Sequence, residues 1–154
     1  MSTTTYFVLL LLHILGATIW TGGHLVLATT VLPRALRAKR AAILSDFEQG
    51  YERVGMPALA LQIVTGLLLA YRLLGAPSHW FEAHPLAHVV QFKLLCLAGT
   101  GALAVHAKTC VTPRLCDDNL PVLGWHIAGV TVFSVLFVVA GASARLGGFP
   151  FFQS

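Results

Sequence analysis

Long apolar stretches, separated by shorter polar segments, dominate the hydropathy pattern of the chain. Four of them are long enough to cross a bilayer, which takes about 20 residues each. They are predicted as transmembrane helices over residues 6–32, 57–74, 86–107 and 122–144. Proline or glycine follows each stretch closely, as expected where a helix ends. The pattern predicts an all-α membrane protein with a single domain, residues 1–154. Because short connections favour antiparallel neighbours, we expect an antiparallel four-transmembrane-helix bundle.

Composition supports the membrane assignment. The chain is 56% hydrophobic and only 10% charged, whereas soluble domains carry roughly 25% charged residues. A soluble protein of this size would lack the polar surface that it needs. The formal net charge of +4 is small, so nucleic acid is not an expected partner and membrane lipid is.

The distribution of lysine and arginine predicts the orientation. The segment 33–56 is rich in basic residues, and the segment after the third helix carries two more. The positive-inside rule places both in the cytoplasm, with 33–56 as the longer cytoplasmic loop. Both termini are then periplasmic. We therefore expect a multi-pass protein of the bacterial inner (cytoplasmic) membrane.

Two histidines lie inside the first helix, His13 and His24. Eleven residues at about 100° each make roughly 1,100°, so both rings leave the same face, separated by about 16 Å of rise. Gly16 and Trp20 lie on the same stripe. An ionisable side chain inside a transmembrane segment marks a functional site by default, although a lone histidine there also serves as an interhelical hydrogen-bonding group.

The later helices add further histidines. His88 and His106 are eighteen residues apart, five whole turns, and so share a face of the third helix. His126 begins the fourth helix. The second helix has no histidine, but its Gln62 and Thr65 are polar. The predicted topology then gives two clusters: His13 with His88 and the loop residues His84 and His79 near the outer face, and His24 with His106 and His126 near the inner face.

Such clusters suit a b-type haem, which takes two imidazoles from different helices at one depth. Gly16 leaves room for a flat ring and Trp20 packs against it. Lys93, Arg72 and Arg145 are candidates for holding the haem propionates at the outer side. The first interpretation is thus a membrane cytochrome with two haems, exchanging electrons with a quinone or a small oxidant. Whether it is a haem-dependent oxidoreductase stays open.

Copper is the alternative ligand, because neutral imidazole suits it and three histidines at one depth suit it better than haem. The candidate metal ligands are then His13, His24, His84, His88, His106 and His126. The only methionines are Met1 and Met56, so a thioether relay is absent. A third interpretation is a non-catalytic membrane partner subunit whose histidines only pack. Glycine-rich helix faces also make a homo-oligomer plausible.

Several short motifs resemble a known family. The pattern of His13, Trp20 and Gly22 resembles the opening helix of the copper resistance D (CopD) family and of the related HemJ-type protoporphyrinogen oxidases. Further resemblance lies in Glu52-Arg53 with Thr65-Gly66, and in Lys93-Leu94-Leu95 with His106.

The two branches of this resemblance imply different functions. The HemJ branch implies a haem-b membrane protein whose essential histidine and lysine correspond to His13 and Lys93. The copper branch implies copper movement across the inner membrane, usually together with a periplasmic copper carrier. This chain departs from both by adding His24 and His126, and these extra rings favour a second cofactor.

Overall fold

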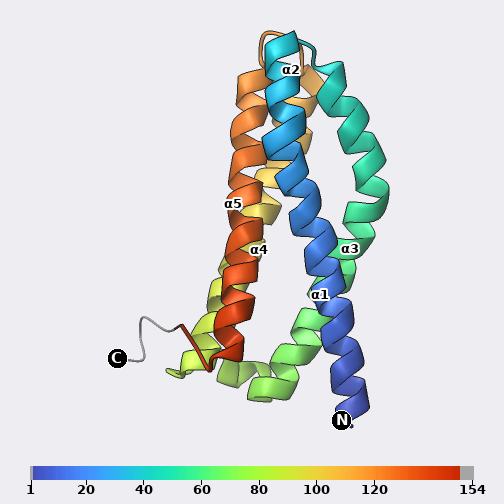
Figure 1. The fold of residues 1–154 in the computed structure, drawn as a ribbon. Coiled ribbons are helices and arrows are strands. Elements are labelled where there is room, and N and C mark those ends of the chain that lie inside the picture. The colour runs from blue at the N-terminus through green and yellow to red at the C-terminus, as the bar shows by residue number, and fades with distance from the viewer. Residues whose placement is uncertain (1, 150–154) are drawn as a thin grey trace.

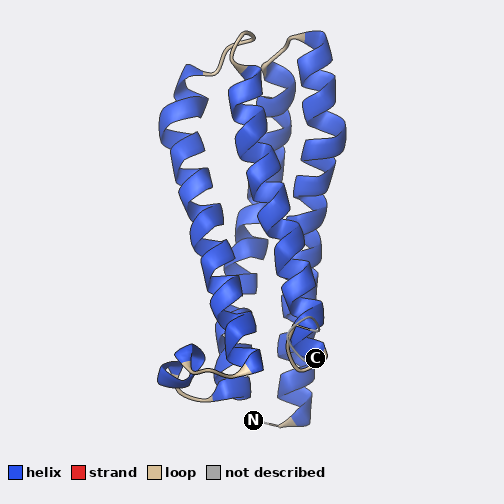
Figure 2. Ribbon diagram, turned by 90° about the vertical axis from the view of Figure 1, so that its left-hand side faces the viewer, coloured by secondary structure: helices blue, strands red, loops and turns tan. Residues whose placement is uncertain are grey.

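The computed structural model describes residues 2–149, and these form four long antiparallel helical spans with no strand among them (Figures 1 and 2). The long helices are α1 (Thr3–Val26), α3 (Ala42–Leu74), α4 (Pro85–His106) and α5 (Leu120–Arg145). A π-helical turn, η1 (Leu27–Val31), joins α1 to α2 (Leu32–Ala38), and α4 continues through η3 (Ala107–Val111) and η4 (Thr112–Arg114). The loop between α3 and α4 holds the 3₁₀-helix η2 (Pro77–Phe81). All four spans are long and apolar enough to cross a membrane, which confirms the predicted fold class.

The second span begins earlier than the sequence pattern indicates. α3 begins at Ala42 rather than near Pro57, so most of the segment predicted as a cytoplasmic loop is helical. Charged residues and Pro57 hide this part of the helix from a hydropathy pattern. A helix needs apolar residues only where it crosses the hydrocarbon, and transmembrane helices tolerate an internal proline. Lys39, in the left-handed conformation with φ of 50°, ends α2 and turns the chain towards α3.

The first and third spans also run past the prolines that were expected to end them. A π-helical turn precedes Pro33 in one span and Pro113 in the other. Proline has no amide N–H, and its ring clashes with the carbonyl four residues earlier. In each span the residue before the proline instead donates to a carbonyl five residues back, Leu27 or Ala107. This wider turn lets the helical path continue with little bending.

The helices pack as two pairs. α1 packs mainly on α3 and α4 mainly on α5, while contacts between α1 and α5 join the two pairs; α3 and α4 touch only slightly. Two ends result (Figure 1). The "basic end" contains α2, the start of α3, η3, η4 and the start of α5. The "terminal end" contains the start of α1, the end of α5 and the α3–α4 loop.

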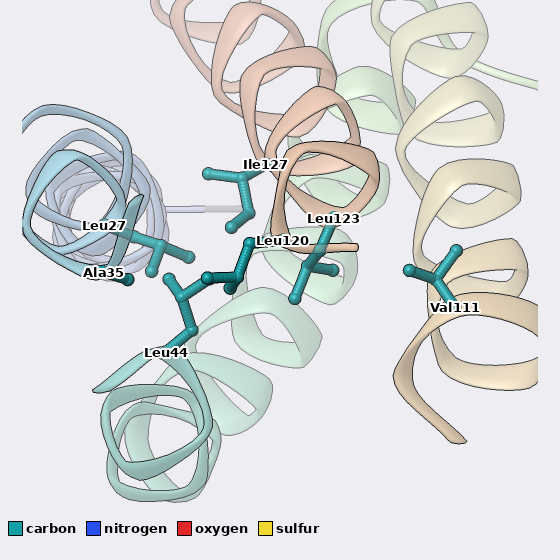
Figure 3. Close-up of a cluster of buried hydrophobic side chains, with 7 residues drawn as sticks. All are labelled: Leu27, Ala35, Leu44, Val111, Leu120, Leu123 and Ile127. Atoms are coloured by element: carbon teal, nitrogen blue, oxygen red, sulfur yellow. The ribbon is translucent and has the colours of Figure 1, made fainter. Parts of the chain in front are cut away.

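A hydrophobic cluster holds the basic end together. Its members are Leu27, Ala35, Leu44, Val111, Leu120, Leu123 and Ile127 (Figure 3). All are at least nine-tenths buried. Farther along the spans, many large apolar side chains are exposed, among them Phe7, Ile14, Leu67, Leu95 and Val132. Such an exposed apolar surface is what a bilayer would cover.

Candidate metal-binding histidines

His13 lies between α1 and α3. Its Nδ1 is 3.1 Å from the Gln62 carbonyl oxygen and 3.0 Å from Thr65 Oγ1. The Thr65 hydroxyl donates to the Leu61 carbonyl, at 2.7 Å. The His13 Nδ1–H therefore donates to both the Gln62 carbonyl oxygen and Thr65 Oγ1. Nε2 then carries the lone pair of the neutral ring. Gly66 makes room for this ring, because a Cβ there would lie 3.1 Å from His13 Cε1.

The predicted stripe on α1 is therefore real, and it faces α3. At Gly16 a Cβ would lie 3.0 Å from the Ala58 carbonyl oxygen and 3.3 Å from Gln62 Cβ. Gly16 thus serves a close approach of two helices. Beside it, Gln62 is 8% exposed and its Oε1 has no hydrogen-bond partner in the described chain.

His24 is 8% exposed and belongs to an aromatic cluster. Its Nδ1 donates to the carbonyl of Trp20, at 2.9 Å, and the same carbonyl accepts the Tyr51 hydroxyl at 3.0 Å. The Trp20 ring lies 4.4 Å from the imidazole, and the Tyr51 ring meets it edge-on at 5.6 Å. Tyr51 reaches this position only because Gly23 has no side chain, since a Cβ there would overlap the phenol ring. The sequence prediction missed Tyr51, and the glycine at residue 23 is the only signal that pointed to it.

His106 and His126 meet each other across two helices at the basic end. His106 Nδ1 lies 2.8 Å from His126 Nε2, and the two rings are nearly parallel, with centroids 5.0 Å apart. His126 Nδ1 donates to the Val122 carbonyl at 2.9 Å. Its Nε2 is therefore the acceptor in the neutral ring, and His106 Nδ1–H donates to it. Two imidazole nitrogens from α4 and α5 thus meet at one point.

The other predicted site residues lie apart from these groups. His88 is exposed on α4, and no described contact joins it to His13. His84 caps α4, its Nδ1 accepting the Leu86 amide at 3.2 Å. His79 donates from Nδ1 to the Leu74 carbonyl at 3.0 Å.

The predicted basic side chains Lys93, Arg72 and Arg145 lie in three different places. Lys93 extends towards α5, where its Nζ lies 3.7 Å from the position of a Cβ on Gly141, and it is close enough to His13 for its charge to act on that ring. The Arg72 guanidinium lies over the Tyr6 ring, 4.5 Å from its centroid. Arg145 is exposed at the end of α5.

The predicted inner cluster of three histidines does not form. Within residues 2–149 no three histidine, cysteine, aspartate or glutamate side chains are placed to hold one metal ion. His24 turns towards Tyr51 on α3, while His106 and His126 turn towards each other. The individual residues stay predictions as ligands, and the His106–His126 pair is the one place where two histidine rings meet among the described residues.

Comparison with known proteins addresses the family. No curated protein and no solved structure gives a match. The copper resistance protein D family matches residues 45–144, which is well over half of the chain. The matched range includes α4, nearly all of α5, and the pair His106 and His126, whereas His13 and His24 precede it. The chain is a multi-pass membrane protein that belongs to the copper resistance protein D family.

Proposed function

We propose that this protein binds a copper ion between His106 and His126, in the bacterial cytoplasmic membrane, as part of copper handling. The observation that carries the proposal is the 2.8 Å approach of two imidazole nitrogens from separate helices. Imidazole is a ligand that copper favours. Family membership supplies the reason to choose copper among the metals that imidazole binds.

The pair needs only a small adjustment to accept an ion. Metal–imidazole bonds of about 2.0 Å, as zinc makes, place two nitrogens of a tetrahedral ion roughly 3.3 Å apart. The observed 2.8 Å separation would widen by about half an ångström. The proton that His106 Nδ1 now donates would move to its Nε2. Because His126 Nδ1 stays bonded to the Val122 carbonyl, that ring is already held in the tautomer that offers Nε2 to a metal.

The surroundings hold the pair in place. Two residues after His106, the Lys108 ammonium forms an ion pair with Glu52 on α3. This contact fixes the end of α4 against the neighbouring helix pair. His126 precedes Ile127, which belongs to the hydrophobic cluster of the basic end. Both imidazoles lie at the surface of the bundle rather than inside its packing.

Haem receives less support than copper. The matching family is named for copper resistance. The histidine pairs predicted for haem, His13 with His88 and His24 with His106 or His126, do not lie together in the described chain. An absorption spectrum of the purified protein separates the two. A colourless protein that carries copper supports the proposal, and a Soret band with α-bands that sharpen on reduction would overturn it.

The ligand pair itself is tested by copper titration of the chelator-treated protein in detergent. We expect His106→Ala and His126→Ala each to remove one equivalent of tightly bound copper. His88→Ala is the matched control, since it removes an exposed α4 histidine outside the pair. Retention of full copper stoichiometry and affinity in both pair variants would refute the assignment and leave a partner-subunit role.

A further inference from the structure

A second group of metal-binding side chains lies at the terminal end, in the loop between α3 and α4. An open pocket of about 300 Å³ there is lined by Leu73, Leu74, His79, Glu82 and His84. It lies at the opposite end of the bundle from His106 and His126 (Figure 1). The predicted topology turns this end towards the periplasm. An ion that arrives from that side would meet the protein here first.

The His79 ring is already in a metal-binding tautomer. Its Nδ1 lies 3.0 Å from the Leu74 carbonyl oxygen, and a carbonyl only accepts, so the ring proton is on Nδ1. Nε2 of the neutral ring is therefore a bare lone pair. Metal-bound histidines commonly use this arrangement, with the second nitrogen donating to a backbone carbonyl that fixes the ring.

A carboxylate lies close to that nitrogen. His79 Nε2 is 4.0 Å from Glu82 Oε1, which is too long for a hydrogen bond. Bonds of about 2.0–2.2 Å from one tetrahedral ion to an imidazole nitrogen and a carboxylate oxygen give a separation of roughly 3.3–3.6 Å. The two donors would have to close by about half an ångström to share an ion, which their exposed side chains allow.

The loop that carries them is anchored. Trp80, between the two donors, is buried, and its Nε1 donates to the Gly75 carbonyl at 3.1 Å. The Trp80 carbonyl in turn accepts Gln91 Nε2 at 2.9 Å. Gly75 adopts φ of 78°, a conformation that favours glycine, and a Cβ there would lie 3.3 Å from His79 Nδ1. The backbone around the donors is therefore fixed by α3 on one side and α4 on the other.

His84 lines the pocket in a different state. Its Nδ1 accepts the Leu86 amide, so the neutral ring carries its proton on Nε2 and does not offer that nitrogen to a metal. No described histidine, cysteine, aspartate or glutamate completes a group of three here. We therefore count His79 and Glu82 as the protein ligands, with water filling the remaining positions.

We propose that His79 and Glu82 bind a divalent transition-metal ion, with Cu²⁺ the tightest, at the water-exposed terminal end. A nitrogen and oxygen donor set suits Cu²⁺, which heads the affinity order of the divalent first-row metals. That copper is the natural ion rests on the proposed function. That His79 and Glu82 form a metal-binding pair does not rest on it, and Zn²⁺ binding tests this pair independently.

The test uses the full chain in detergent, carrying His106→Ala and His126→Ala so that the other pair is absent. Titration with Cu²⁺, followed by electron paramagnetic resonance and calorimetry, should show one bound ion with nitrogen in its coordination sphere. Adding His79→Ala or Glu82→Gln should weaken Cu²⁺ and Zn²⁺ binding at least tenfold. His88→Ala, added instead, is the matched control and should change neither.

Both donors are well exposed, with side chains 51% and 63% accessible, so the variants should stay folded, which size-exclusion chromatography checks. Unchanged affinity in either variant, or no Cu²⁺ binding before they are added, would overturn the proposal. Such a failure does not affect the proposal for His106 and His126. That proposal is tested separately, by the copper that is lost when only this pair is removed.

Discussion

The histidines of α1 and those of α4 and α5 show two ways of keeping an imidazole in an apolar bundle. His13 and His24 each donate to oxygens of the helix framework and lie within α1–α3 packing. His106 and His126 are accessible and bond to each other. The first pair is therefore built into the stability of the fold, whereas the second brings two nitrogens from different helices to one point. Only the second arrangement is close to what a bound ion requires.

The largest expected difference concerns the removal of one ring from each region. His24→Ala deletes a buried side chain between Trp20 and Tyr51, so it should lower the free energy of unfolding by about 2–4 kcal/mol, in the range of large-to-small core substitutions. His126→Ala removes an accessible ring, and the stability should change little. Equilibrium unfolding of both variants in detergent with increasing sodium dodecyl sulfate measures this. Equal losses in the two variants would remove the distinction between the regions.

A second prediction sharpens the role of Tyr51. Gly23→Ala places a methyl group on the phenol ring and should cost roughly 1–3 kcal/mol, as overpacking does. Gly22→Ala is the matched control, because nothing lies within 4 Å of a Cβ there. In a Tyr51→Ala background the penalty of Gly23→Ala should vanish. A penalty that persists there would mean that another contact at residue 23 is responsible.

The smallest expected effect concerns the hydrogen bond of His13. Thr65→Val removes the hydroxyl that His13 Nδ1 contacts and keeps the shape, while the Gln62 carbonyl still accepts. Polar contacts between membrane helices average about 0.6 kcal/mol, and we expect a loss of that size. Thr29→Val is the control, since the Thr29 hydroxyl bonds only within its own helix, to the Leu25 carbonyl. Identical losses in both variants would show that His13 adds nothing at residue 65.

The fold was predictable because crossing the hydrocarbon takes an apolar stretch of about 20 residues, and each of the four spans is long and apolar enough to do so. The start of α3 could not be predicted in this way. The residues before Pro57 are helical, but they lie outside the most apolar stretch of the span. Helical periodicity also predicted correctly that His13 and His24 share a face. It gives no information on how one helix is rotated against another, so the sequence grouped His24 with His106 and His126, whereas only His106 and His126 meet. Tyr51 was missed for the same reason.

X-ray absorption at the copper edge, on a variant in which His79→Ala and Glu82→Gln remove the terminal-end donors, tests the central claim most directly. The account predicts one copper ion with two imidazole ligands at about 2.0 Å, and loss of that imidazole signal on His126→Ala. A copper environment without imidazole, or one that His126→Ala leaves unchanged, would contradict it.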